Sequence, residues 1–298
     1  MRRRKFDIWA FLINLGFVFS SIVIFIIPLM LVFSVALTSE EEIYANGYQL
    51  IPSRIDFTAF AYVFSNMRQI VDSYGVTAFQ SFLGTFLSVT VMSMCAYSLS
   101  KPYFAFKTPL TLYIFITMIF GGGLIPSYII NTQYLHLGNT IWIYIVPGLV
   151  SGFYIIVLRT FFQGLPASLS ESAKLDGASE PSIFLNIVLP LSKPVLATVS
   201  LLILLDRWNN WYTALIYIRD TRLYTLQFLL QKILMESQAM QAMIDNIPPW
   251  ASRQYSFRMP LESLRYAMCI IAAGPMLVIF PFFQKYFARG LTIGAVKG

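Results

Sequence analysis

The sequence has few of the residues that metal sites and disulfides require: one histidine and two cysteines among 298 residues. Cys95 and Cys269 both fall in apolar runs, where we expect small buried side chains, not a disulfide or metal site. His136 has no cysteine, histidine or carboxylate at ligand spacing, so we expect it in a solvated loop. The phosphate-binding pattern G-x-x-x-x-G-K-[ST] is absent from the sequence. If the protein uses nucleotide energy, another chain must bind the nucleotide.

Charge is also scarce: 12% of the residues are charged, against roughly 25% in a soluble domain. Apolar residues make up 57% of the chain and gather in runs that reach or approach the ~18 residues of a transmembrane helix. The six runs that we expect to cross the membrane are residues 14–37, 73–99, 109–130, 140–162, 194–218 and 267–287. The first is too long for a removed signal peptide and has no small-residue cleavage site. The sequence therefore predicts an all-α integral membrane protein with six transmembrane helices in one domain, residues 1–298.

The positions of the basic residues predict the orientation of the chain. Of the 21 lysines and arginines, 12 lie before the first run, between the second and third, between the fourth and fifth, or after the sixth, when Arg159 and Lys285 at the ends of the fourth and sixth runs are included. Six crossings place these segments on one side, and basic loops favour the cytoplasm. Both termini are therefore predicted to be cytoplasmic. The net charge of +7 is spread along membrane boundaries, so nucleic acid is not an expected partner.

Two outer loops contain enough periodicity to fold but too little apolar sequence to cross. The first, residues 38–72, is predicted to hold a short helix near residues 57–71. The last, residues 219–266, contains an amphipathic stretch over residues 224–244 that ends before Pro248 and Pro249. Inside the third run, three consecutive glycines, 121–123, are followed by Pro126. They indicate either a close helix approach or a loosened helix that lines a cavity.

Polar residues in the fifth run indicate a path for a solute, because charges within a membrane are costly unless they are paired or face water. Helical spacing puts several of these residues on one side. The candidate pathway residues are Asp206, Arg207, Asn209, Asn210, Trp211 and Thr213. Two alternatives stay open: Asp206 and Arg207 form a structural ion pair, or the aromatic residues belong to an interfacial belt.

A polar stretch, residues 166–190, separates the fourth and fifth runs. Ser168 and Glu171 have the spacing of a capping box, and Gly177 is a natural helix stop. The sequence thus predicts a short cytoplasmic helix over residues 166–176, too short and too polar to cross. Pro181 can open a second helix, and Pro190 and Pro194 are expected to bend the chain into the fifth run.

The spacing within this stretch resembles a family signature. Glu171-Ser172-Ala173, three residues, Gly177, nine residues and Ile187-Val188-Leu189-Pro190 are similar to the E-A-A-x3-G-x9-I-x-L-P motif. That motif is typical of the membrane subunits of binding-protein-dependent ABC importers. Ser172 departs from it, although serine is as small as the expected alanine. The segment AYSLS at residues 96–100 and the tail GLTIGAVKG at residues 290–298 also resemble carbohydrate permeases related to the inner maltose-type subunit. FGGGLIPSY, RWNNWYTALIYI and SLRYAMCIIAAGPMLVIFPFFQKYF resemble the branch that handles complex oligosaccharides, including uronate-containing ones.

The resemblance implies a type I ABC importer permease fold with a cytoplasmic coupling helix. The residues that it implies for ATPase coupling are Glu171, Ser172, Ala173, Asp176, Gly177 and Ala178. It also implies an ATPase contact in the tail, which we expect to be extended, through Gly290, Thr292, Gly294 and Lys297. If the cargo carries uronate carboxylates, Arg207 offers a bidentate contact.

The same resemblance implies a multi-pass subunit in the cell membrane of a prokaryote. Its expected partners are a second homologous permease, two ATPase subunits, an extracytoplasmic solute-binding protein and an oligosaccharide. No cofactor is expected in this chain, since ATP and Mg²⁺ would bind the ATPase subunits. One rival is an ion-coupled secondary transporter, but Asp206 is the only carboxylate deep in a run. The other is an intramembrane enzyme, for which we find no catalytic constellation.

Overall fold

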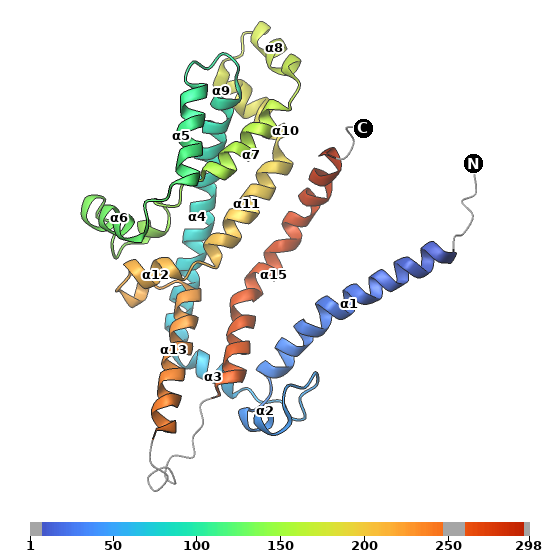
Figure 1. The fold of residues 1–298 in the computed structure, drawn as a ribbon, viewed down its shortest axis with the longest axis vertical. Helices are drawn as coiled ribbons and strands as arrows, with labels where there is room; N and C mark the ends of the chain where they lie inside the picture. Colours follow the sequence, from blue (N-terminus) through green and yellow to red (C-terminus); the bar gives the residue numbers. More distant parts are fainter. Residues whose placement is uncertain (1–7, 247–259, 295–298) are drawn as a thin grey trace. The chain divides into compact units, whose positions relative to one another are not determined.

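The computed structural model describes residues 8–246 and 260–294, and within these ranges every regular element is a helix. Figure 1 shows the ribbon. The chain divides into two compact units. One contains Met1–Met67 and Leu230–Pro275, and the other contains Arg68–Leu229 and Met276–Gly298.

The first unit contains the helix α1 (Ile8–Ala36) and the short helices α2 (Glu40–Asn46) and α3 (Thr58–Val63). It also holds most of α13 (Leu226–Asp245) and the first part of α15 (Leu261–Gly294). Ser39 accepts a hydrogen bond from the Glu42 N–H and so caps α2, while three glutamates in the first turn suit the positive end of the helix. The predicted amphipathic stretch 224–244 is confirmed by α13. The expected helix near 57–71 is divided between α3, a 3₁₀ turn (Phe64–Asn66) and the start of α4.

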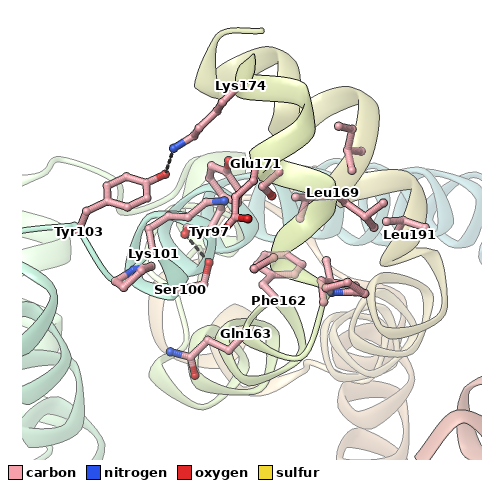
Figure 2. A pocket seen from close by; sticks show the side chains of 17 residues that line it. Tyr97, Ser100, Lys101, Tyr103, Phe162, Gln163, Leu169, Glu171, Lys174 and Leu191 are labelled. Carbon is pink, nitrogen blue, oxygen red and sulfur yellow. Dashed lines mark hydrogen bonds between the residues drawn. The ribbon is translucent and has the colours of Figure 1, made fainter. Parts of the chain in front are cut away.

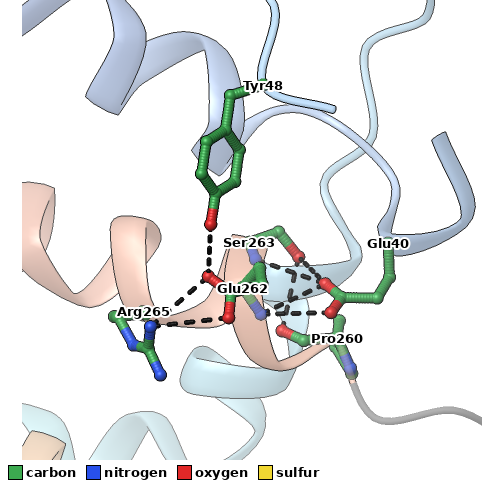
Figure 3. A network of polar contacts seen from close by, with 6 residues as sticks. All are labelled: Glu40, Tyr48, Pro260, Glu262, Ser263 and Arg265. Atoms are coloured by element: carbon green, nitrogen blue, oxygen red, sulfur yellow. Dashed lines mark hydrogen bonds and ion pairs between the residues drawn. The ribbon is translucent and has the colours of Figure 1, made fainter. Parts of the chain in front are cut away.

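Glu40, the first residue of α2, links that helix to the start of α15 (Figure 3). Its carboxylate, 8% exposed, accepts hydrogen bonds from the backbone N–H groups of Glu262 and Ser263 at 3.2–3.3 Å. These N–H groups have no partner within the helix, so an anion there stabilises the helix start. Tyr48 donates to Glu262 at 2.9 Å, and this hydrogen bond raises the pKa of Tyr48 to about 12.

The second unit is a group of helices around α4 (Met67–Ser100). In chain order, α4 is followed by α5 (Lys107–Ile119), α6 (Leu124–Ile129), a π turn (Ile130–Tyr134), a 3₁₀ turn (Ile141–Tyr144), α7 (Gly152–Gln163), α8 (Ala167–Leu175), α9 (Glu180–Ile183), a π turn (Phe184–Val188), α10 (Leu189–Leu191), α11 (Lys193–Trp208), α12 (Tyr212–Tyr217) and a 3₁₀ turn (Thr221–Leu223). In Figure 1, α8 lies at one end of the group, beyond the ends of α5 and α7. The core joins α4 to α7, α9 and α11 through buried residues such as Met92, Leu158, Ile183 and Val199.

Three described helices are long and apolar enough to cross a membrane alone: Phe11–Ala36, Met67–Ser100 and Leu261–Gln284. They match the first, second and sixth predicted runs. Bent helix pairs bring the total to as many as six. The pair Lys107–Ile119 and Leu124–Tyr134 bends by 113° after the glycine run, where Gly123 has a φ of +83°. The third run is therefore a broken helix.

Two other runs also differ from the prediction of continuous helices. Residues 141–151 form a 3₁₀ turn and irregular backbone, and α7 begins only at Gly152. Pro147 and Gly148 explain the break, since proline lacks a donor and glycine weakens a helix. In the fifth run, α11 ends at Trp208 and α12 begins at Tyr212. Cys95 is half-buried but Cys269 is exposed, so the prediction of two buried cysteines is wrong for Cys269.

Candidate functional site

The loop between α7 and α11 folds locally as the sequence predicts. The predicted helix over 166–176 is confirmed by α8, and Gly177 follows it with a φ of +81°. The Ala178 N–H donates to the Ala173 carbonyl at 2.9 Å, and the Gly177 N–H donates to the Lys174 carbonyl at 3.0 Å. This pair of bonds is a Schellman motif, which ends a helix and needs a residue that tolerates positive φ. Gly177 is therefore required by the backbone of the turn.

The start of α8 differs from the prediction. Its N-cap is Pro166, and no side chain caps the helix, so the predicted capping box of Ser168 and Glu171 is wrong. The helix begins at Ala167, which puts Ser168 inside the first turn where it cannot act as the N-cap. Further along, Pro181 lies at the start of α9 as predicted, and the chain bends by 80° between Glu180–Leu191 and Lys193–Trp208.

The motif residues of the loop divide between two faces. Ala173 and Ala178 are partly buried and pack against the core cluster, whereas Glu171, Ser172 and Asp176 are exposed. Leu175 is 90% exposed, and the sequence interpretation missed it. The available signal was an apolar residue at the last position of a short polar helix, two residues before the glycine that ends it. The loop thus presents an acidic and an apolar side chain outward from a packed base.

Polar side chains join this loop to the end of α4. A cavity of about 270 Å³ lies between α8 and residues 97–103, and Figure 2 shows Lys174 reaching from α8 to Tyr103. The Glu180 carboxylate accepts hydrogen bonds from Tyr97, Tyr103 and Lys174. Partial burial opposes the charge of Glu180, but the hydrogen bonds outweigh it and lower the pKa of Glu180 to about 2. Sequence reasoning did not identify this group, although Lys174 and Glu180 flank the predicted glycine stop.

A second, polar cavity of about 500 Å³ lies within the unit, among α4, α6, α7, α11, α12 and the irregular segment 141–151. Four predicted pathway residues line it: Asp206, Arg207, Asn210 and Thr213. The other two, Asn209 and Trp211, are not among its lining residues. The side-chain oxygen of Asn210 accepts from the Thr213 N–H at 3.0 Å and so helps α12 to begin. Helical spacing alone did not group these residues correctly, because the helix breaks between them.

Residues from α6 and its π turn complete the wall of this polar cavity, and the sequence interpretation missed them. Asn131 donates a hydrogen bond to the Tyr217 hydroxyl at 3.3 Å, and both residues line the cavity. Tyr128 stacks on Tyr217 with ring centroids 5.6 Å apart. The glycine break before α6 was the available signal, since it turns this short helix back toward α12. The break thus places polar and aromatic groups beside the cavity.

Arg207 does not pair with Asp206 among the described ion pairs. Its Nη1 donates to the Tyr144 carbonyl at 2.7 Å, and its Nη2 donates to the Gly148 carbonyl at 2.8 Å and the Ser88 hydroxyl at 2.9 Å. The side chain is 5% exposed. Arg207 therefore donates to carbonyls of the irregular segment, which no regular helix pairs there.

These contacts bear on two possibilities that the sequence left open for Arg207. The alternative of a structural ion pair with Asp206 is not found among the ion pairs of the described residues. Both hydrogens of Nη2 are used, so neither edge of the guanidinium presents two donors to a carboxylate. The bidentate cargo contact is therefore absent from this arrangement. Gly84 on α4 makes room for the group: a Cβ there would lie 2.6 Å from Nη1 and 2.7 Å from Cζ.

The tail also differs from the prediction. α15 runs to Gly294, so the expected extended chain is wrong for Gly290, Thr292 and Gly294. Lys297 lies outside the described residues. The helix continues because the residues before Gly290 carry no proline after Pro281, and a single glycine does not end a helix.

Bent helix pairs, the short polar helix α8 that ends one of them and a cavity with polar side chains in its wall are features expected of a multi-pass membrane permease. A model of the family described as "Binding-protein-dependent transport system inner membrane component" matches residues 2–293. The chain belongs to this family and is the permease subunit of an ABC importer. This membership does not favour the rival ion-coupled transporter.

Relatives extend over the whole chain. It is 34% identical to the "Polygalacturonan/rhamnogalacturonan transport system permease protein YtcP" of Bacillus subtilis (strain 168), with 100% of both chains covered. It is also 34% identical to "Protein LplC" of the same organism, over 92% of this chain and 90% of that protein. Among solved structures, a chain of "a bacterial ABC transporter involved in the import of the acidic polysaccharide alginate" has a TM-score of 0.75 and 26% identity. That match covers 96% of this chain and 99% of the other.

Proposed function

We propose that this permease moves a uronate-containing oligosaccharide across the cell membrane of a prokaryote. The observation that carries the proposal is the coupling loop: α8 presents Glu171 and Leu175 outward, while Ala173 and Ala178 fix its base to the core. Such a surface suits an ATPase subunit that binds ATP and Mg²⁺ and pushes on α8. The acidic cargo is supported by the names of the two similar proteins, the polygalacturonan permease and the alginate importer.

The polar cavity supports a path for sugar. Amide and hydroxyl groups of Asn131, Asn210 and Thr213 suit sugar hydroxyls, and the ring of Tyr217 suits the apolar face of a sugar. Asp206 is exposed and lines the same cavity, so its carboxylate would accept from sugar hydroxyls. Asn209 and Trp211 remain proposed contacts outside the cavity wall.

The remaining parts of the assembly follow from the same proposal. A second, homologous permease completes the translocation path, two ATPase subunits dock on the coupling loops, and an extracytoplasmic solute-binding protein delivers the cargo. Both termini lie in the cytoplasm, as the basic residues favour. The end of α15 and Lys297 contact the ATPase interface, a proposal that rests on the resemblance of the tail alone.

Proteoliposomes that contain the whole complex test this function. With the solute-binding protein and internal ATP, we expect uptake of short oligogalacturonates, and no uptake of maltodextrins of equal length. Uptake should persist when ionophores collapse the ion gradients. Uptake that needs a gradient but no ATP would contradict the ABC assignment. Uptake of the maltodextrins alone would contradict the acidic cargo while leaving the transport mechanism intact.

Glu171→Ala and Leu175→Ser should each weaken binding of the ATPase subunits. Glu171 loses a charge-assisted contact worth about 1.5–3 kcal/mol, and Leu175, 90% exposed in the free chain, loses about 1.5–3 kcal/mol of burial. Co-purification of the ATPase with the tagged permease measures the effect, and each change should lower recovery roughly tenfold or more. Glu236→Ala, a change to an exposed glutamate on α13, is the control. Full recovery with both variants would show that the ATPase docks elsewhere.

A further inference from the structure

One carboxylate collects donors from three separate parts of the second unit. Glu180, at the start of α9, accepts from Tyr97 on α4 and from Tyr103 in the α4–α5 turn, each at 2.5 Å. Lys174 on α8 lies 2.7 Å from the same carboxylate and donates to the Tyr103 hydroxyl at 2.9 Å. We call Tyr97, Tyr103, Lys174 and Glu180 the Glu180 cluster. The donors differ in direction, so together they fix the carboxylate in space.

The turn at Gly177 brings two members of the Glu180 cluster together. The Schellman motif reverses the chain between α8 and α9, so that Lys174 and Glu180 face the same side. The Lys174 ammonium also lies 4.2 Å from the centre of the Tyr103 ring, which is a favourable cation–π distance. The position of α8 is thus tied to the α4–α5 turn by contacts that do not pass through α7.

Apolar packing also joins the segment after α8 to α4. Ile183 in α9 is fully buried, and Val188 in the following π turn is 3% exposed. Both belong to the core cluster that contains Tyr97 and Met92 of α4. The ring of Phe184 lies 5.0 Å from the ring of Tyr97. The segment after α8 is therefore fixed to α4 by both polar and apolar contacts.

The ion pair between Lys174 and Glu180 adds little to the stability of the protein. The side chains of Lys174 and Glu180 are 41% and 40% exposed, and pairs this exposed contribute only about 0–1 kcal/mol to stability. The contacts of the Glu180 cluster matter for position instead. Because they join separate elements, a displacement of one element is passed on to the others. α4 also provides Ser88, which lines the polar cavity and holds Arg207.

We infer that Glu180 is a positioning residue that makes α4 move with the coupling helix, in addition to α7 and α11, which the loop joins directly. This inference rests on the proposed docking of the ATPase on α8. A displacement of α8 would pass through the Glu180 cluster to the cytoplasmic end of α4 and along that helix to the cavity. Loss of the cluster should leave ATPase binding intact and uncouple hydrolysis from uptake.

The test compares Glu180→Gln with the wild-type complex in proteoliposomes that take up oligogalacturonates. We expect normal recovery of the ATPase subunits, because Glu171 and Leu175 are unchanged, and a ratio of sugar imported to ATP hydrolysed that falls roughly threefold or more. The charge reversal Lys174→Glu with Glu180→Lys should restore part of the ratio by rebuilding the ion pair. Glu236→Gln, which removes the charge of an exposed pair at 3.7 Å, should leave the ratio unchanged.

Hydrogen exchange of the permease alone gives a second measurement that needs no transport. Backbone exchange over residues 170–183 should accelerate roughly two- to fivefold in Glu180→Gln, and exchange over α13 should not change. An unchanged import ratio in a folded, ATPase-bound Glu180→Gln complex would overturn the inference. So would a loss of ATPase binding in proportion to uptake, which would make the cluster only a support for docking. If wild-type complex showed no ATP-dependent uptake, the proposed function would fail first, whatever the exchange result.

Discussion

Arg207→Met should cost the permease about 3–5 kcal/mol of unfolding free energy, because it leaves neutral buried acceptors without their donor at roughly 1–3 kcal/mol each. Methionine fills similar space but donates nothing to the Tyr144 and Gly148 carbonyls or to the Ser88 hydroxyl. Tyr144 and Ser88 are 5% and 1% exposed, so water does not replace the hydrogen bonds lost there and each loss is expensive. Thermal unfolding of the purified permease should show a midpoint lower by roughly 10 °C.

Uptake separates this structural role from cargo recognition. Because Arg207 acts through the segment 141–151, Arg207→Met should lower uptake of acidic and neutral oligosaccharides to the same extent, per folded complex. Arg207→Lys should recover only part of the stability, since one ammonium cannot replace the fork of the guanidinium. Arg222→Met is the control, because its side chain is 82% exposed and its ion pair is with the nearby Asp220. A selective loss of acidic cargo with normal unfolding would show that Arg207 recognises the cargo.

The parts of the site that depend on neighbouring residues were predictable from the sequence. The helix α8, its stop at Gly177 and the opening of α9 at Pro181 all rest on local backbone rules, which a short stretch of sequence contains. The spacing of the coupling motif is local too. The long helices α1, α4 and α15 were also predictable, because an unbroken apolar run longer than the bilayer has few alternatives.

The parts that depend on distant residues were not predictable. Tyr97 and Glu180 are 83 positions apart, and a single hydrogen bond across that distance leaves no periodic pattern. Apolar composition also failed over residues 140–151, because it does not separate a membrane helix from irregular backbone whose carbonyls are satisfied by another element. Arg207 on α11 donates the hydrogen bonds to these carbonyls, from 59 to 63 positions further along the chain. The charge was visible in the sequence, but its partners were not.

The distance along the chain between Gly84 and Arg207 also explains why the sequence did not reveal the role of Gly84. In the sequence it is one glycine in a long apolar helix, where close packing is a sufficient explanation. In the structure it faces the guanidinium of Arg207 directly: a Cβ would lie 2.6 Å from Nη1, 2.7 Å from Cζ and 3.0 Å from Nε. Arg207 cannot retreat easily, because its hydrogen bonds to Tyr144 and Gly148 hold it in place.

Gly84→Ala should therefore destabilise the permease by about 2–4 kcal/mol, although alanine is normally the better helix former. Overpacking costs about 1–3 kcal/mol, and a displaced guanidinium leaves at least one buried acceptor unpaired at a further ~1–3 kcal/mol. Gly75→Ala is a matched control on the same helix, because its Cβ would meet nothing within 4 Å. That change should be neutral or stabilise the protein by about 0.5–1 kcal/mol. Unfolding of both variants in the same detergent measures the difference.

The double variant Gly84→Ala with Arg207→Met decides whether the glycine acts through the arginine. If the added methyl group harms the protein only by displacing the guanidinium, it should cost little once the guanidinium is gone. We then expect the double variant to be about as stable as Arg207→Met alone, with an interaction energy within the roughly 0.5–3 kcal/mol seen for contacting residues. Additive losses would contradict this explanation, since they would mean that Gly84 is needed for helix packing independent of Arg207.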